Sequence, residues 1–460
     1  MRSILTLEES RNLDKELIAK LSLQSERLIE NAGHSSAGII KSELISGSSI
    51  LFLIGPGNNG ADGLVAAECL ASEGYRISIY FYKWEKAGEA NKARAASVHE
   101  YADVCSSIPS ADCYNAVVEA LFGFSFRGCL DDDVLAFLNE AKRVYALDAP
   151  AGFAYSAYKT ITFTLPKKEF YFGNRSRIGF IDIVNPGFPE SELEKCGSDI
   201  HLLDSSDISR SVIPPTAYKN TRGHAALLAG SDNYPGAALL ASRSLYKSGA
   251  GLVSLYSSDA VLDFAISSEP GIIRGIKDSF SGYDSILIGP GWGKGGMSQF
   301  EKAIGSGVPY VIDADGLALV RGRKLPGTAV LTPHIGEYRK LLIQYGIEGG
   351  LTERKIKMLA ASANAVVAVK SSVVYISDGC DIYIYDGENP ALGIAGSGDI
   401  LSGVIASALA RGIRPLQAAI DGVVMHQMAG KELAAKNGLF TASELLEEIG
   451  KVCFRYIFSL

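Results

Sequence analysis

The chain has 460 residues, of which 47% are hydrophobic and 21% charged, and its formal net charge is -7. This length exceeds one ordinary hydrophobic core and predicts two or three domains, with two large domains as the best fit. The ordinary composition argues against intrinsic disorder. No basic run is interleaved with aromatic residues, so the sequence argues against nucleic-acid binding and favours small-molecule partners.

Seven cysteines are scattered along the chain without a CxxC pair. This pattern predicts reduced thiols and a cytoplasmic protein. The first residues, MRSILTLEESRNLDKELI, carry charges every few positions and lack the apolar core of a signal peptide. Apolar runs such as 50–54 are far shorter than a membrane span and end at glycine, so we expect no membrane segment.

The first half of the chain alternates segments typical of helices and strands. We expect a helix through Leu28 and Ile39, a strand over 50–54 with a glycine loop, a helix over 64–72, a strand over 76–82, a helix over 90–98, a strand over 115–121, a helix over 134–141 and a strand over 144–147. Residues 160–184 look rich in strands that complete the same sheet. This order predicts a doubly wound α/β domain that resembles a Rossmann sheet.

Polar residues and the pair Pro214–Pro215 interrupt the pattern, which predicts a linker over 205–215 and domains at 1–205 and 206–460. A second α/β series follows. It comprises strands over 225–228, 252–256, 285–288 and 309–312, helices over 237–247 and 337–344, a hairpin-like segment over 373–386, and two long helices that begin at Asp399 and Pro415.

The motif GPGNNGADG, residues 55–63, follows the first strand directly. Its small residues let the backbone approach a ligand closely, and the next helix offers unpaired N–H groups to a phosphate. Asn58 and Asn59 add amide oxygens and Asp62 a carboxylate, which suit a cation or ribose hydroxyls. A glycine turn capped by asparagine is the structural alternative, and the density of the motif argues against it.

Three further segments follow in order: LIENAG at 28–33, VVEALFGFSFRG at 117–128 and ALDAPAG at 146–152. Together with the loop, they resemble the YjeF N-terminal family of NAD(P)H-hydrate epimerases over residues 1–205. The resemblance implies that the hydrate is bound by Asn58, Asn59, Gly60, Asp62, Gly123, Phe124, Ser125, Arg127 and Asp148. It further implies that Asp148 is catalytic and that potassium is bound by Asn59, Glu119 and Ala151.

Asp148 is expected at the C-terminal end of a strand, where ligands of α/β sheets bind. Epimerisation at C6 of the hydrated ring breaks and remakes a C–O or C–N bond, and a carboxylate can move the proton or stabilise an iminium ion. A strand-end cap is the structural alternative for this residue alone. The family usually has Asp at the position of Glu119 and Ser at the position of Ala151. Because Ala151 lacks the serine hydroxyl, it offers potassium only its backbone carbonyl.

The segment GIAGSGDILSGVIASALARG, residues 393–412, places a glycine loop directly before a helix. Backbone N–H groups of 395–398 can stabilise charge on a transferring phosphoryl group, and Asp399 can remove a proton from the attacking hydroxyl. This arrangement resembles the ribokinase-like superfamily. A glycine cap before an amphipathic helix is the structural alternative.

Five more segments narrow the resemblance: 229–253, ILIGPGWG at 286–293, VIDADGLAL at 311–319, LTPHIGEY at 331–338 and AVVAVKSS at 365–372. Together they resemble the NAD(P)H-hydrate dehydratase domain, over residues 206–460, with a ribokinase-like α/β/α fold. The resemblance implies hydrate contacts by Ala237, Gly291, His334 and Asp399. It implies ADP or AMP contacts by Lys370, Ser371, Ser372, Val373, Val374 and Gly398, although the family usually has Gly at the position of Ser371.

The implied reaction fits this chemistry, because a C6 hydroxyl leaves readily only after phosphorylation. We expect ADP as the donor, giving AMP and phosphate, with ATP as the alternative. Magnesium would arrive with the nucleotide, near Asp313 and Asp315, whereas six dispersed histidines argue against zinc or iron. In the segment TPHIGE, Thr332 is expected to cap a helix with Pro333 as its first residue.

The sequence thus predicts a bifunctional metabolite-repair enzyme for NADH-hydrate and NADPH-hydrate, and the family implies a homo-oligomer. The alternative is a ribokinase-like small-molecule kinase, similar to hydroxyethylthiazole kinase, with a non-catalytic nucleotide-binding module at its N-terminus. The TPHIGE and GPGWG segments count against that kinase.

Overall fold

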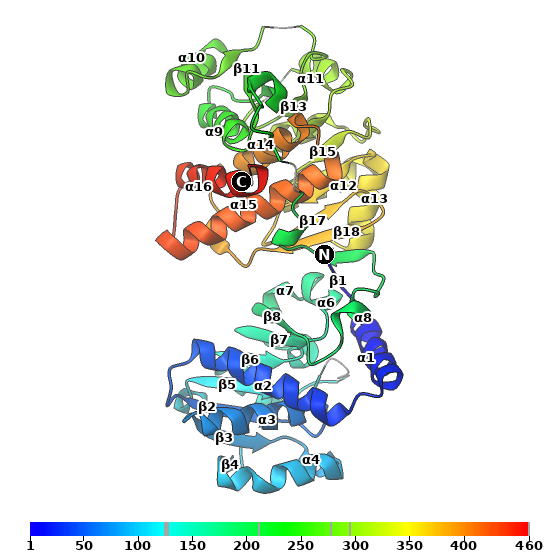
Figure 1. Ribbon diagram of the computed structural model, residues 1–460, viewed down its shortest axis with the longest axis vertical. Helices are drawn as coiled ribbons and strands as arrows, with labels where there is room; N and C mark the ends of the chain where they lie inside the picture. The colour runs from blue at the N-terminus through cyan, green and yellow to red at the C-terminus, as the bar shows by residue number, and fades with distance from the viewer. Residues whose placement is uncertain (124–127, 210–211, 277, 294–295, 459–460) are drawn as a thin grey trace. The chain divides into compact units, whose positions relative to one another are not determined.

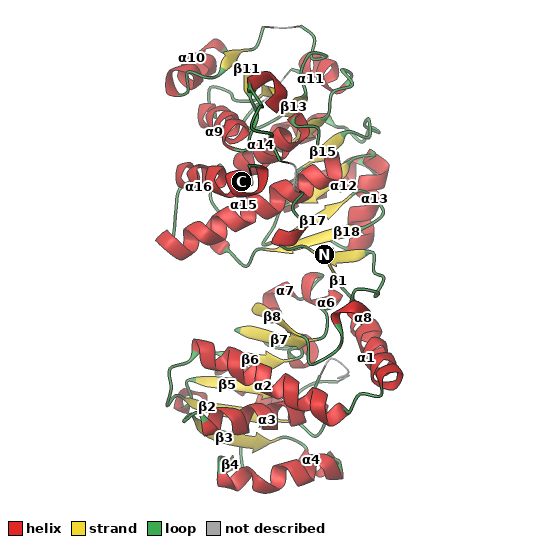
Figure 2. Ribbon diagram, viewed as in Figure 1, coloured by secondary structure: helices red, strands yellow, loops and turns green. Residues whose placement is uncertain are grey.

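The computed structural model describes residues 1–123, 128–209, 212–276, 278–293 and 296–458, which form two compact α/β units (Figure 1). One unit comprises Arg2–Ser198 and the other Asp199–Leu460 together with Met1. Strands alternate with helices in both units (Figure 2), which confirms the predicted two-domain α/β fold class. No helix among the described residues is long and apolar enough to cross a bilayer.

The division between the units falls after Ser198, earlier than the linker predicted over 205–215. Strand β9 (Ile200–Leu202) pairs with a strand of the second unit, and Ile208 and Ile213 are buried in its core. Much of the predicted linker therefore packs as part of the second unit.

The sheet of the first unit is parallel throughout, in the order β4-β3-β2-β5-β6-β7-β8. The strands of this sheet are β2 (Ser49–Ile54), β3 (Arg76–Phe81), β4 (Asp103–Cys105), β5 (Ala116–Ala120), β6 (Val144–Leu147), β7 (Lys159–Phe163) and β8 (Phe180–Val184), and the short strand β1 (Arg2–Ser3) precedes them in the chain without joining this sheet. The helices are α1 (Leu7–Leu21), α2 (Ser25–Glu43), α3 (Asn58–Ser72), α4 (Glu89–Arg94), α5 (Asp132–Glu140), α6 (Lys168–Tyr171), α7 (Arg175–Ile178) and α8 (Glu190–Leu193).

Both faces of this sheet are covered, as the doubly wound prediction requires. Ile50 and Phe52 of β2 belong to one apolar cluster, whereas Leu51 and Leu53 belong to another. Successive side chains of a strand point to opposite faces, so each cluster lies on its own side of the sheet.

The glycine loop after β2 is shorter than predicted, because α3 begins at Asn58 and not near residue 64. A Cβ atom on Gly60 would lie 1.9 Å from the carbonyl oxygen of Gly55. A Cβ atom on Gly55 would lie 1.7 Å from the carbonyl oxygen of Leu121. Glycine is thus required at both positions, because the turn from β2 into α3 is tight and because the backbone at Leu121 lies so close to Gly55.

The sheet of the second unit has the order β9-β18-β17-β16-β15-β14-β13-β10-β11-β12. Its strands are β10 (His224–Leu228), β11 (Leu252–Tyr256), β12 (Ile273–Arg274), β13 (Ser285–Ile288), β14 (Tyr310–Ile312), β15 (Ala329–Leu331), β16 (Val366–Val369), β17 (Val373–Ser377) and β18 (Ile382–Asp386). Strands β10 to β16 pair in parallel, and β17 pairs antiparallel with β16 and β18, which confirms the predicted hairpin.

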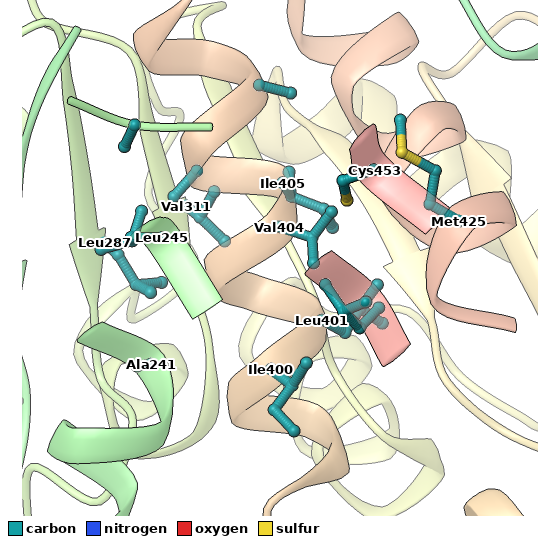
Figure 3. Packing of buried hydrophobic residues seen from close by; sticks show 14 of the residues in the cluster. Ala241, Leu245, Leu287, Val311, Ile400, Leu401, Val404, Ile405, Met425 and Cys453 are labelled. Atoms are coloured by element: carbon teal, nitrogen blue, oxygen red, sulfur yellow. The ribbon is translucent and has the colours of Figure 1, made fainter. Parts of the chain in front are cut away.

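The helices of the second unit are α9 (Pro235–Lys247), α10 (Asp259–Ser268), α11 (Met297–Ile304), α12 (Ile335–Gln344), α13 (Glu353–Ala363), α14 (Ser397–Ala410), α15 (Pro415–Asn437) and α16 (Ala442–Ile457). The central helix is α14, which is buried over residues 400–410. Figure 3 shows its side chains between Leu245 and Val311 on one side and Met425 and Cys453 on the other. The start of α14, which carries the glycine motif, is therefore held by the core.

We predict that Ile405→Ala destabilises the second unit by about 2–5 kcal/mol, because Ile405 is fully buried and the substitution leaves a cavity. The matched control is Ile343→Ala on α12, where the side chain is 78% exposed and the expected change is within about 0.5 kcal/mol. The chain has two tryptophans. A Trp84→Phe background therefore lets Trp292 fluorescence report urea unfolding of this unit, and equal losses for both variants would contradict the packing described.

Candidate active sites

A cavity of about 480 Å³ lies in the first unit, at the C-terminal ends of its central strands. It is lined by five predicted hydrate-binding residues, Asn58, Asn59, Asp62, Gly123 and Asp148. Gly60 is buried behind them in the first turn of α3. The other predicted contacts, Phe124, Ser125 and Arg127, lie outside the described residues.

Asp148 directly follows β6 and is 6% exposed. Its backbone has φ of 66°, a left-handed conformation that is uncommon for a residue with a side chain. A Cβ atom on Gly123 would lie 2.9 Å from Asp148 Oδ2, so glycine leaves room beside the carboxylate. Such conformations concentrate at functional sites, which favours the catalytic interpretation of Asp148 over a simple strand-end cap.

The structure adds two residues to this site that no motif predicted. Lys167 is fully buried, and its Nζ lies 3.8 Å from Asp148 Oδ1. Asp14 of α1 lines the cavity and accepts a hydrogen bond of 3.1 Å from Thr164 Oγ1. Burial lowers the pKa of Lys167, whereas Asp148 and Asp14 oppose that shift.

Two of the cavity's carboxyl groups hold protons more tightly than usual. Burial raises the pKa of Asp14 to about 6, with Lys167 and the Thr164 hydroxyl opposing the rise and Asp148 adding to it. Burial, reinforced by Asp148, also raises the pKa of Asp62 well above its ordinary value. Carboxyl groups with such pKa values are suited to general acid–base chemistry near neutral pH.

The predicted potassium ligands fit an ion only in part. Oε1 of Glu119 accepts the Leu121 N–H at 2.8 Å, and Oε2 accepts the Ala151 N–H at 3.0 Å and the Tyr155 hydroxyl at 2.8 Å. Because this carboxylate is already occupied by donors, it does not fit a cation ligand. Asn59 Oδ1 is buried without a hydrogen-bond partner among the described residues and does fit one.

The second site surrounds the start of α14. Asp399 lies in the first turn, after Gly396, whose φ is 90°. Lys370, at the end of β16, forms a 2.7 Å ion pair with Asp313 Oδ1, and a Cβ atom on Gly398 would lie 3.2 Å from Lys370 Nζ. The structure thus brings together the predicted base, the predicted nucleotide residues Lys370 and Gly398, and a buried aspartate.

Electrostatics favour a proton acceptor at Asp399. Burial raises the pKa of Asp399 to about 7, Asp313 and Asp315 add to the rise, and Lys370 opposes it. A carboxylate with a pKa near 7 is matched to removing a proton at neutral pH. Asp315 also accepts the Gly293 N–H at 2.7 Å, so it holds the GPGWG loop.

Two other predicted hydrate contacts, Ala237 and Gly291, lie against each other. A Cβ atom on Gly291 would lie 2.7 Å from the Cβ of Ala237, and Gly291 has φ of 57°. Both features require glycine at this position.

The helix cap predicted at Thr332 is wrong, because Thr332 still donates its N–H to Ile312 in the neighbouring strand and α12 begins at Ile335. His334 is the N-cap residue instead, and its Nδ1 accepts the Gly336 N–H at 2.9 Å. The His334 side chain is 61% exposed, and its Nε2 lies 3.4 Å from Glu337 Oε1.

The remaining nucleotide predictions fall on β17 and the turn before it. Val373 and Val374 are 1% and 2% exposed, so they offer a ligand only their backbone. Ser371 Oγ donates to the Val373 carbonyl at 2.5 Å, whereas Ser372 is exposed.

Sequence reasoning also missed His426 of α15. Its Nε2 lies 3.1 Å from both the hydroxyl and the carbonyl oxygen of Ser397, inside the glycine motif. Burial lowers the pKa of His426 to about 4, so the ring is neutral at physiological pH. His426 therefore holds the first residue of α14 in place. No local signal marks it, because the contact joins two helices that are far apart in sequence.

Comparison with known proteins agrees with this division of the chain. A family model described as YjeF-related protein N-terminus matches residues 25–168, and one described as NAD(P)H-hydrate dehydratase matches residues 225–451. A ribokinase-like superfamily protein from Enterococcus faecalis, with a TM-score of 0.51 and 22% identity, covers 57% of this chain and 98% of its own, and shows the fold.

Two curated relatives span both units. The bifunctional NAD(P)H-hydrate repair enzyme of Methanopyrus kandleri is 30% identical over 94% of this chain and 93% of its own length. The enzyme of the same name from Hyperthermus butylicus is 28% identical over 92% of this chain and 87% of its own length. With matches to both family models and to full-length relatives, the chain belongs to the family of bifunctional NAD(P)H-hydrate repair enzymes.

Proposed function

We propose that this protein repairs hydrated NADH and NADPH in two steps, first as an isomerase and then as a lyase. The proposal rests on one observation: each unit has its own buried acid–base centre, around Asp148 in the first and around Asp399 in the second. We assign epimerisation of the R and S hydrates to the first unit and dehydration of the S hydrate to the second.

In the first unit, Asp148 would act at C6 of the hydrated ring. The lone pair of N1 expels the C6 hydroxyl, which takes up a proton and leaves as water, and an iminium ion forms. Return of water to the opposite face gives the other epimer. The carboxylate beside the ring stabilises the cation and moves the proton. Because Glu119 is already occupied by hydrogen-bond donors, no step here uses potassium.

In the second unit, Asp399 would take the proton from the C6 hydroxyl, whose oxygen then attacks the terminal phosphoryl group of ADP, with ATP as the alternative donor. AMP leaves, and C6 carries a phosphate ester. N1 assists departure of phosphate, and loss of a proton from C5 restores the double bond. Lys370 and the N–H groups at the start of α14 stabilise the transferring charge.

Magnesium would be held mainly by the nucleotide phosphates, with Asp313 and Asp315 in the neighbourhood of Asp399. Among the described residues, no group of three His, Cys, Asp or Glu side chains could hold a metal ion. A cytoplasmic location and a homo-oligomer remain predictions. All seven cysteines are free thiols, which suits a reducing compartment.

Single substitutions should separate the two activities. We expect Asp148→Asn to lower the interconversion of R and S hydrates at least 100-fold, because the variant lacks the charged oxygen beside the ring. Dehydration of the S hydrate should remain unchanged in this variant. Asp399→Asn should slow dehydration of the S hydrate and leave the interconversion of R and S hydrates unchanged. Chromatography of the two epimers without nucleotide measures the first activity, and phosphate release with nucleotide measures the second. Loss of both activities in either variant would contradict the assignment.

The pH dependence of dehydration tests the role of Asp399 as base. Because a carboxylate accepts a proton only when ionised, the rate should fall below about pH 7, where Asp399 becomes protonated. Lys370 lowers the pKa of Asp399, so Lys370→Met should shift this fall to higher pH in addition to slowing the reaction. Lys340→Met, at an exposed position on α12, is the control. An unshifted pH profile in Lys370→Met would argue against Asp399 as the titrating base.

A further inference from the structure

The N-terminal helix α1 contributes a carboxylate to the first cavity. The helix is fixed at its start by a capping box between Thr6 and Glu9, and along its length by Leu17, which is buried in an apolar cluster with Leu165 and Phe188. Asp14 lies one turn before Leu17, on the same helix face. Burial of Leu17 therefore directs Asp14 at the cavity, which Asp14 and Ile18 both line.

Asp14 and Asp148 meet around one buried cation. Lys167 Nζ lies 3.8 Å from Asp148 Oδ1, donates to the Phe163 carbonyl, and is the charged group that most lowers the pKa of Asp14. Asp148 and Asp14 in turn both raise the pKa of Lys167. These residues form one coupled group from three separate segments of the chain.

The residues that follow β6 and β7 have an unusual backbone conformation and take part in this coupled group. Asp148 follows β6 with φ of 66°, and Thr164 follows β7 with φ of 71°. The left-handed conformation is especially uncommon for a β-branched residue such as threonine. Here it accompanies the 3.1 Å hydrogen bond from Thr164 Oγ1 to Asp14 Oδ1. The two neighbouring strands are thus followed by residues in the same costly conformation. After β6 this residue is the cavity carboxylate Asp148, and after β7 it is Thr164, which holds the second carboxylate, Asp14.

We propose that Asp14 is a second catalytic carboxylate of the epimerase and that Lys167 is a positioning residue for both Asp14 and Asp148. This inference rests on the proposed function of the first unit. Exchange of configuration at C6 removes a hydroxyl from one face of the ring and returns it to the other. One group must therefore donate a proton and a second must accept one.

The proton balance of this step closes without a further reagent. One carboxylic acid donates its proton to the C6 hydroxyl, the C6–O bond breaks, N1 supplies its electron pair, and water leaves. A water molecule then adds to C6 from the other face, and the second carboxylate accepts the proton that it loses. Exchange with solvent returns the two carboxyl groups to their starting states.

The charged groups around Asp14 set its protonation. Lys167, Asp148 and Asp62 belong to the same buried region, and Arg11 and Lys15 of α1 also line the cavity. The pKa of Asp14 is raised from 3.8 to about 6. Because the folded state disfavours the ionised form, Asp14 reduces stability increasingly between about pH 4 and pH 6, and by a constant amount above. Neutralising it should therefore stabilise the fold near neutral pH.

The experiment compares Asp14→Asn with Glu16→Gln, an exposed carboxylate on the same helix, in the full chain. We expect Asp14→Asn to lower kcat for conversion of R to S hydrate about 100-fold, with KM changed less than about threefold. It should unfold at the same or a higher temperature than the wild type. Glu16→Gln should behave as the wild type, and both should dehydrate the S hydrate normally, which controls for folding of the second unit.

Epimerisation by Asp14→Asn within about threefold of the wild-type rate would overturn the inference. If the wild type itself fails to epimerise, the proposed function of the first unit fails instead. If Asp14→Asn unfolds, the variant Thr164→Val tests the inference in its place. Loss of its hydroxyl raises the pKa of Asp14, so the change in epimerase rate near pH 6 should move to higher pH. An unmoved profile in Thr164→Val would also overturn the inference.

Discussion

A lysine beside a buried aspartate, at the C-terminal end of a parallel sheet, is the interaction on which each site depends. In the first unit Lys167 lies beside Asp148, and in the second Lys370 pairs with Asp313. Burying the charge of either aspartate without a partner would be strongly unfavourable, so the lysine must be placed beside it. In both sites the lysine also lowers the pKa of another carboxyl group, Asp14 or Asp399.

This arrangement explains why the surrounding backbone is so constrained. The carboxylates and lysines lie where strands end, and glycines around them let chains approach closely, as at Gly55, Gly60 and Gly291. The central helix α14 is buried along most of its length, so its first turn cannot shift without disturbing the core (Figure 3). A rigid scaffold of this kind holds catalytic groups in place before substrate binds.

Much of this architecture could be predicted from the sequence. Buried strands and amphipathic helices gave the α/β order, and the glycine motifs gave the loops around Asn59 and Asp399, because both signals are local. Local signals also mislead: the glycine motif predicts a longer loop before α3 than the structure has, and the sequence predicts a cap at Thr332, which still pairs with the neighbouring strand.

The residues that the sequence did not reveal act over long separations. Asp14 reaches its site from a helix that precedes every recognised motif, Lys167 follows a strand with no motif around it, and His426 contacts the start of α14, 29 residues earlier. Their importance arises from burial and from neighbours that only the fold brings together. Spacing in a single sequence holds no record of such contacts.

The most direct test of the whole account follows the near-ultraviolet absorbance that reduced nicotinamide has and its hydrate lacks. The protein is incubated with mixed R and S hydrates of NADH, magnesium, and either ADP or ATP. We predict recovery of nearly all the NADH with one of these donors. Recovery that stops when the S hydrate is consumed would contradict an active first unit. A stable phosphorylated product with no NADH would contradict the repair function and favour a small-molecule kinase.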